Sequence, residues 1–305
     1  MAIEKYRGRI IDAHNHPDWH GHNLDRFLAN MDHHGIARAW LFSWVCPADE
    51  LEQSFNAALP FDVLGATDGP IPFSRCLSYI ERAPERFVLG YAPDPRTVGA
   101  IDRMKAAINI YGARLCGEVK VRMMYDNPDA IALYRFCGEQ GVPVTVHIDY
   151  PIPMASSYPR ANYWYGGGIE AFERALQQCP DTTFLGHAPG FWAHISGDEK
   201  FATEYYPAGK VEPGGKLPKM LRTYPNLNCD ISAGSGHNAL GRDPEFGRAF
   251  MLEFQDRILY ARDYFDGRHQ DLLEQFDLPE DVLEKVLFGN AERLVPDLVP
   301  KEVIA

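Results

Sequence analysis

Short apolar runs alternate with longer segments of helical periodicity along almost the whole chain. Several of the runs, such as 142–148, are rich in β-branched apolar residues, which is typical of strands buried on both faces. We predict strands at 9–13, 39–45, 86–91, 113–121, 142–148, 182–185, 227–231 and 257–261. We predict helices at 24–34, 48–59, 97–111, 128–140, 169–179, 216–223, 244–253 and 279–294.

Strands that are each followed by a helix predict an α/β fold with a parallel sheet. Eight such units are the number in a closed (β/α)8 barrel, the TIM barrel. We therefore predict one barrel domain over residues 1–305, with a doubly wound open sheet as the alternative. The Gly- and Pro-rich segment 188–215 follows a strand, so we expect it to be a lid or wall over the mouth of the barrel.

Composition and charge narrow the class of partner. The chain has 305 residues, of which 46% are hydrophobic and 24% charged, as in ordinary globular proteins. Its net charge of −12 disfavours nucleic acid, because phosphate backbones are repelled. We expect a small-molecule substrate, itself anionic and bound by local cations, and leave a homo-oligomer open.

Cysteine usage and the N-terminus bear on the compartment. The six cysteines form no CxxC pair, which favours free thiols in a reducing compartment. Residues 1–9 lack the apolar core of a signal peptide, and no apolar run approaches the roughly 18 residues that a bilayer requires. We predict a cytoplasmic protein without membrane attachment.

A pair of histidines ends the first predicted strand. Side chains alternate along a strand, so His14 and His16 point to the same side and can bind one metal ion together. By itself such a pair is also compatible with a polar loop. Three further strands finish on potential ligands, namely His147, His187 and Asp263. Parallel barrel strands all end at one face, so these side chains are expected to converge there.

These residues carry a resemblance to the amidohydrolase superfamily, and within it to the amidohydrolase 2 branch. It extends over nearly the whole chain and rests on Asp12-Ala13-His14-Asn15-His16, His147, His187, Asp263 and the segment Phe288-Gly289-Asn290-Ala291-Glu292-Arg293-Leu294. The resemblance implies a (β/α)8 barrel in which His14, His16 and His147 bind the metal. It further implies that Asp263 binds metal or acts as a base, and that His187 contacts the reacting water or the substrate.

One residue departs from the pattern of that branch. Such proteins usually have a small residue before the final aspartate, whereas this chain has Arg262. We expect Arg262 to point away from Asp263 and to alter the local pocket.

The fourth predicted strand carries Glu118, Lys120 and Arg122 on one face. In related hydrolases a glutamate or a carboxylated lysine on this strand supports the metal site, so Glu118 or Lys120 could support a second metal, with Glu118 as the further candidate ligand. The alternative is a buried ion pair between Glu118 and Lys120. The candidates for substrate binding are Lys120, Arg122, Arg160, Trp19 and Trp192.

The hypothesis that unites these features is a metal-dependent hydrolase of a lactone, ester or amide bond in a small organic acid. One Zn2+ per chain is expected, with Mn2+ and a second ion as alternatives, and with Asp263 and His187 as the catalytic residues. A decarboxylase or hydratase of an aromatic-derived acid is the alternative enzyme. A barrel that binds a ligand without turnover is the alternative from another class.

Overall fold

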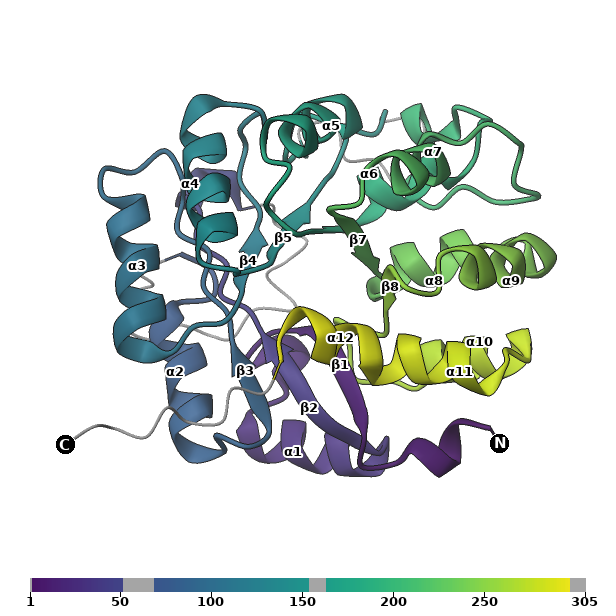
Figure 1. Cartoon of the computed structure of the whole chain (residues 1–305), viewed down its shortest axis with the longest axis horizontal. Coiled ribbons are helices and arrows are strands. Elements are labelled where there is room, and N and C mark those ends of the chain that lie inside the picture. Colours follow the sequence, from purple (N-terminus) through teal and green to yellow (C-terminus); the bar gives the residue numbers. More distant parts are fainter. Residues whose placement is uncertain (1, 52–68, 154–162, 297–305) are drawn as a thin grey trace.

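The computed structural model describes residues 2–51, 69–153 and 163–296, in which helices surround a central set of parallel strands (Figure 1). The strands are β1 (Ile10–Asn15), β2 (Ile36–Leu41), β3 (Phe87–Leu89), β4 (Cys116–Val119), β5 (Val144–His147), β6 (Phe184–His187), β7 (Leu227–Asp230) and β8 (Ile258–Leu259). The longer helices are α1 (Leu24–His33), α2 (Phe73–Arg82), α3 (Ala100–Tyr111), α4 (Pro128–Glu139), α5 (Ile169–Gln178), α7 (Lys216–Thr223), α8 (Ala233–Gly241), α9 (Pro244–Glu253) and α10 (Arg268–Phe276). The shorter ones are α6 (Pro189–Trp192), α11 (Glu280–Glu284) and α12 (Asn290–Leu294).

Backbone hydrogen bonds close the strands into a barrel. Strands β1 to β3 pair in parallel, and so do β4 to β8. A parallel bridge between Gly90 and Leu115 joins the β3 and β4 edges. At the opposite seam, the Ala13 amide donates to the Tyr260 carbonyl over 3.0 Å, which links β1 to the end of β8. The predicted (β/α)8 barrel is therefore confirmed, and the open sheet is excluded.

Local sequence explains the helices, as α4 shows. The Asn127 side chain caps the helix by accepting from the Asp129 amide over 2.9 Å, and Pro128 occupies the first turn, where its missing N–H costs nothing. Ile131 and Tyr134 lie three residues apart on the buried face, and Gly141 follows the end of the helix.

Four α-helices of the structure were not predicted from the sequence, namely α2, α6, α8 and α10. Of the helix predicted at 48–59, Ala48–Glu50 forms a short 3-10 helix, and residues 52–59 lie outside the described ranges. Helix α8 begins Ala233-Gly234-Ser235-Gly236, a composition that normally indicates a loop, and it packs against α9 and α6.

A buried ion pair joins β1 to the end of β8. The Arg262 guanidinium lies 2.9 Å from the Asp12 carboxylate, and neither residue is exposed to solvent. Arg262 also donates to Asn30 on α1 over 2.8 Å. The Arg262 side chain is thus directed at Asp12 and Asn30, in keeping with the expectation that it points away from Asp263, and forms part of the seam.

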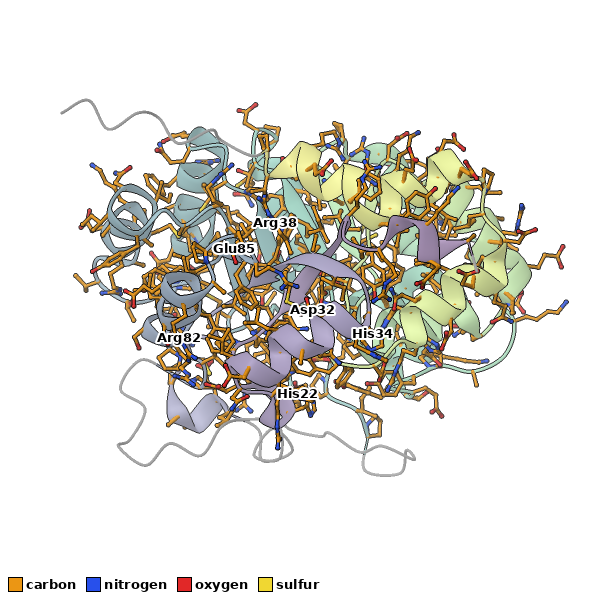
Figure 2. All side chains as sticks on the ribbon, turned by 90° about the horizontal axis from the view of Figure 1, so that it is seen from below. His22, Asp32, His34, Arg38, Arg82 and Glu85 are labelled. Carbon is orange, nitrogen blue, oxygen red and sulfur yellow. The ribbon has the colours of Figure 1, made fainter. Side chains whose placement is uncertain are left out.

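We predict that the Arg262→Ala variant loses about 3–5 kcal/mol of unfolding free energy, because Asp12 would remain buried without its charged partner. Urea unfolding followed by circular dichroism measures this loss. The control is Arg82→Ala, which removes a surface arginine 3.5 Å from the exposed Asp25 (Figure 2). It should cost less than about 0.5 kcal/mol. A loss for Arg262→Ala as small as that of the control would contradict the prediction.

Candidate metal centre

The barrel brings the histidines of three strand ends together at one face. His14 and His16 come from β1, and His147 and His187 end β5 and β6, where they are directly paired neighbours. All four are buried, with at most 6% of each exposed. The His14 and His187 rings lie 4.2 Å apart between centroids, and those of His147 and His187 lie 5.2 Å apart.

In three of these imidazoles, the Nδ1 atom lies within hydrogen-bond distance of an acceptor oxygen. Asp230 lies 3.0 Å from His14 Nδ1 and 3.1 Å from His187 Nδ1. The carbonyl oxygen of Phe42 lies 2.9 Å from His16 Nδ1. A carboxylate or carbonyl accepts a proton, so each of these Nδ1 atoms carries one and each Nε2 keeps its lone pair. Three Nε2 lone pairs are thus free to bind a cation.

His147 is held from its other side. Its Nε2 lies 2.6 Å from Asp149, and its Nδ1 lies 2.5 Å from Glu118. A carboxylate that accepts from one nitrogen of a histidine while the other faces a metal is a common arrangement around metal sites. Asp149 therefore presents His147 Nδ1 to the centre of the cluster.

Glu118 occupies that centre. Its Oε1 atom lies 3.9 Å from His14 Nε2 and 3.7 Å from His187 Nε2, and its Oε2 atom lies 3.5 Å from His16 Nε2. Burial alone would raise the pKa of this carboxyl group, but the charge of Lys120 and the contacts with His147 and His14 outweigh burial and hold the pKa well below its ordinary value. Glu118 is therefore an ionised carboxylate among inward-facing nitrogens.

The Phe42 ring packs between two glycines and the imidazole of His14. The Phe42 ring lies edge-on to His14 at 4.9 Å between centroids. A Cβ atom on Gly117 would meet Phe42 at 2.8 Å, and one on Gly90 would meet it at 2.5 Å. Only glycine leaves room for the ring at these points, so Gly90 and Gly117 allow Phe42 to pack edge-on against His14.

Asp263 follows β8 and faces the same cluster. Its Oδ1 atom lies 3.6 Å from His16 Nε2, and its side chain is 13% exposed, against 2% for Glu118 and none for Asp230. Burial raises the pKa of Asp263 to about 7. The Trp19 indole donates to its carbonyl over 2.8 Å and holds the backbone in the left-handed region at φ 54°. Of these three carboxylates, Asp263 is the one most accessible from the mouth.

The donor set fits a divalent cation. Among the described residues, His14 Nε2 and Asp263 Oδ1 are buried and have no hydrogen-bond partner. Within that part of the chain, three overlapping groups have ligand atoms that all lie within 4.8 Å of one another. They are His14, His16 and Glu118; His14, His187 and Asp230; and Glu118, His147 and His187. Burial lowers the pKa of His16 to about 3, which keeps its ring neutral, as metal binding requires.

The predicted substrate-binding residues lie in different surroundings. Lys120 is buried, with its ammonium 4.2 Å from the centre of the Trp44 ring. Arg122 follows it towards the mouth, where its amide donates to Glu50 over 2.8 Å. Trp19 packs against His16 at 5.1 Å between centroids, and Trp192 is buried and donates to the Asp230 carbonyl over 3.0 Å. Arg160 lies outside the described residues, and the five roles stay predictions.

Sequence reasoning missed Asp149, Asp230 and Ser232. Asp149 lies two residues after His147, and Asp230 ends β7, so both had the strand-end position that signalled the other ligands. His14, the partner of Asp230, lies 216 positions away in the sequence, so only the closed barrel shows the contact.

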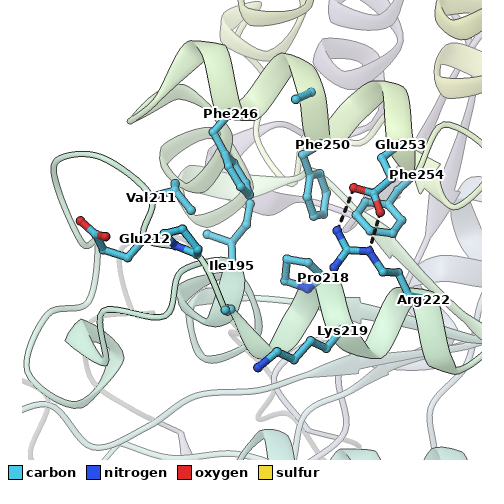
Figure 3. Close-up of a pocket in the computed structure, with 14 residues that line it drawn as sticks. Ile195, Val211, Glu212, Pro218, Lys219, Arg222, Phe246, Phe250, Glu253 and Phe254 are labelled. Atoms are coloured by element: carbon cyan, nitrogen blue, oxygen red, sulfur yellow. Dashed lines mark hydrogen bonds and ion pairs between the residues drawn. The ribbon is translucent and has the colours of Figure 1, made fainter.

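The segment 188–215 begins inside the protein. Residues 188–196 are buried, and only from Gly197 onward does the segment alternate between buried and exposed positions. It contributes Ile195 and Val211 to a surface pocket of about 330 Å3 between α7 and α9 (Figure 3). Arg222 and Glu253 form an ion pair across this pocket (Figure 3). None of its lining residues belongs to the histidine cluster, so this pocket is separate from the candidate metal centre.

Sequence comparison decides the family of this fold and site. A model of the amidohydrolase family matches residues 11–296. The chain belongs to the amidohydrolase family. The resemblance inferred from the histidine motif and the closing segment is thereby confirmed. Members of this family are metal-dependent enzymes, among them hydrolases and decarboxylases. A search of curated proteins found no match for this amidohydrolase.

Solved structures of similar fold cover nearly the whole amidohydrolase chain. A TIM-barrel protein from Bordetella bronchiseptica is 18% identical with a TM-score of 0.62, over 93% of this chain and 97% of that one. A Pseudomonas putida protein assigned as a 2-pyrone-4,6-dicarboxylic acid hydrolase is 15% identical with a TM-score of 0.58, over 94% and 97%. A dihydroxybenzoic acid decarboxylase from Polaromonas sp. JS666, with bound manganese and the inhibitor 2-nitroresorcinol, is 18% identical with a TM-score of 0.58, over 94% and 96%. At these identities the likeness shows the fold.

The described helices of this amidohydrolase are short. Within residues 2–51, 69–153 and 163–296, no helix combines the length and the apolar composition needed to cross a bilayer.

We predict that the Asp149→Ala variant binds zinc about 10–100-fold more weakly, because His147 would lose the acceptor that orients its ring. Competition with a chromophoric chelator measures the affinity. The control is Thr145→Val, on β5 and four residues before Asp149, which replaces a buried hydroxyl outside the cluster by a methyl group of similar volume. It should leave the affinity unchanged. Equal affinity in both variants would show that Asp149 does not orient His147.

Proposed function

We propose that this amidohydrolase uses one divalent cation to hydrolyse a lactone, ester or amide bond in a small carboxylic acid. The observation that carries the proposal is the convergence of inward-facing imidazole nitrogens on Glu118, beside the partly accessible Asp263. His14, His16, His147 and Asp263 would hold the cation, with Glu118 as a further ligand. We propose Zn2+, since imidazole nitrogen and carboxylate oxygen suit it, with Mn2+ as the alternative.

The bound cation would polarise the substrate carbonyl and increase the acidity of water. The residues of this chain would then move the proton. Asp263 would accept it from the attacking water and pass it to the departing oxygen or nitrogen atom as the bond to the carbonyl carbon breaks. The water oxygen would end in the carboxylate product. His187, fixed by Asp230, would contact the water or the substrate.

Charge supports an anionic substrate. Lys120 places a buried ammonium beside the cluster, and its charge lowers the pKa of the neighbouring Glu118. A carboxylate on the substrate would pair with Lys120 or, nearer the mouth, with Arg122. The aromatic rings of Trp44 and Tyr165 lie 4.2 Å and 5.7 Å from the Lys120 ammonium and would favour a planar acid.

Decarboxylation of an aromatic acid is the second candidate. Two observations favour it: the Trp44 and Tyr165 rings lie beside Lys120, and the fold is shared with the manganese-containing dihydroxybenzoic acid decarboxylase. In that reaction the bond from the ring to the carboxyl carbon breaks, carbon dioxide leaves, and Asp263 would deliver a proton to the ring carbon.

Isotope incorporation separates the two reactions. Zinc- and manganese-loaded protein is incubated with lactones, esters and amides of small acids and with hydroxybenzoates, in water enriched in oxygen-18 or in deuterium oxide. Hydrolysis places oxygen-18 in the product carboxylate. Deuterium on a ring carbon together with carbon dioxide would replace the proposal by decarboxylation. Binding without turnover would favour a non-catalytic barrel.

A further inference from the structure

Asp230 at the end of β7 contacts two imidazoles at once. Its Oδ2 atom lies 3.0 Å from His14 Nδ1, and its Oδ1 atom lies 3.1 Å from His187 Nδ1. The residue is fully buried, and its backbone carbonyl accepts from Trp192 over 3.0 Å. One carboxylate therefore joins a side chain from β1 to a side chain from β6.

The neighbouring serine settles where the protons lie. The Ser232 hydroxyl lies 2.5 Å from Asp230 Oδ1 and 2.9 Å from His187 Nδ1. It has one proton, and it donates this proton to the carboxylate, which can only accept. Towards His187 the hydroxyl oxygen can then only accept, so the proton between them belongs to Nδ1. The Ser232 amide also donates to Asp230 Oδ1 over 3.1 Å.

We infer that Asp230 is a shared positioning residue that holds His14 and His187 in the Nδ1–H tautomer, so that both Nε2 lone pairs face the cation site. This inference rests on the function proposed above. The two Nε2 atoms lie 3.9 Å and 3.7 Å from the same oxygen of Glu118, so one carboxylate aims both rings at one point. Asp230 touches neither substrate nor reacting atoms in this arrangement and acts through the two rings.

Asparagine at this position could accept a hydrogen bond from only one of the two imidazoles. The amide of an Asp230→Asn variant has one oxygen that accepts and one nitrogen that only donates. It can accept from one imidazole, but the other imidazole would meet an N–H group and must present a lone pair from Nδ1. That second ring would then carry its proton on Nε2, directed at the cation site. The Ser232 hydroxyl and amide both donate at the Oδ1 position, which favours the amide oxygen there and places the N–H group against His14. His14 is a proposed ligand, so we expect zinc to bind about 10–100-fold more weakly.

Nitrogen-15 NMR of histidine-labelled, metal-free protein tests the inference directly, because Nδ1–H and Nε2–H tautomers give different nitrogen shifts. The signals of His14 and His187 are assigned with single His→Gln variants. Both are expected as Nδ1–H in the wild type, and one is expected to change to Nε2–H in Asp230→Asn. Ser232→Ala is the matched control, since it removes a hydrogen bond from the same cluster but keeps the carboxylate. It should retain both Nδ1–H tautomers and lose less zinc affinity than Asp230→Asn.

The outcomes distinguish this inference from the proposed function. An Nε2–H tautomer at either histidine in the wild type overturns the inference, even if Asp230→Asn does not fold. A folded Asp230→Asn variant with unchanged tautomers and unchanged zinc affinity also overturns it. Wild-type protein that shows both Nδ1–H tautomers and the expected change in the variant, but binds neither zinc nor manganese, supports the positioning role and rejects the metal-dependent function.

Discussion

The Asp263→Asn variant is expected to turn over about 10²–10⁴-fold more slowly than the wild type, with a far smaller change in metal content. Asparagine keeps the volume and one acceptor oxygen of aspartate but cannot take up a proton near neutral pH. His14, His16 and His147 would still supply three nitrogen ligands, which suffice for zinc in known sites. Proton transfer takes place in the transition state, so the loss should appear in kcat.

The measurement pairs steady-state kinetics on the substrate found by isotope incorporation with elemental analysis of the same samples. Metal content within about twofold of the wild type would locate the defect in proton transfer, since loss of the ion would lower both values together. Near-normal turnover would show that another group accepts the proton. The geometry makes His187 and Glu118 the next candidates, because both lie at the same centre.

The double variant His14→Ala/His16→Ala is expected to contain metal near background and to retain its fold. These residues supply two of the inward-facing nitrogens, and alanine leaves no donor in their place. Elemental analysis after growth with zinc measures the metal, and circular dichroism measures the fold. Turnover should be lost with the metal.

The matched control is His33→Ala/His34→Ala. It removes two histidines from the end of α1, where His34 is labelled in Figure 2. Neither belongs to the groups of described residues that could hold a metal ion, so the metal content should equal that of the wild type. Wild-type metal in His14→Ala/His16→Ala would show that the ion is bound elsewhere and would remove the basis of the proposed function.

The buried carboxylates of the candidate metal centre all have imidazole partners. Glu118, Asp149 and Asp230 are carboxylates with at most 2% of each exposed, in a region where an isolated charge is costly. Each contacts at least one imidazole, and the cation proposed to bind there would supply opposite charge. We therefore expect bound metal to raise the melting temperature of this protein.

The helices show where local pattern is sufficient and where it is not. Helix α4 carries its own cap, first-turn proline and apolar spacing, and was predicted within one residue at its end. Helix α10 has Leu272, Leu273 and Phe276 on its buried face. This helical spacing is visible in the sequence, although no helix was predicted there. Helix α8 begins with a glycine-rich sequence, and its packing against neighbouring helices stabilises a conformation that local preference disfavours.

Local sequence pattern was enough to predict the barrel and the type of side chain at its strand ends. Alternation of apolar runs with helical segments predicts the barrel, and strand periodicity places His14 and His16 on one side, because both signals depend on neighbours along the chain. The other features of the centre depend on how the chain folds in space. The tertiary structure placed Glu118 at the centre, turned Arg262 into the seam and brought Asp230 to His14 across 216 positions. Such contacts follow from barrel closure, which brings together strand ends that no local pattern connects.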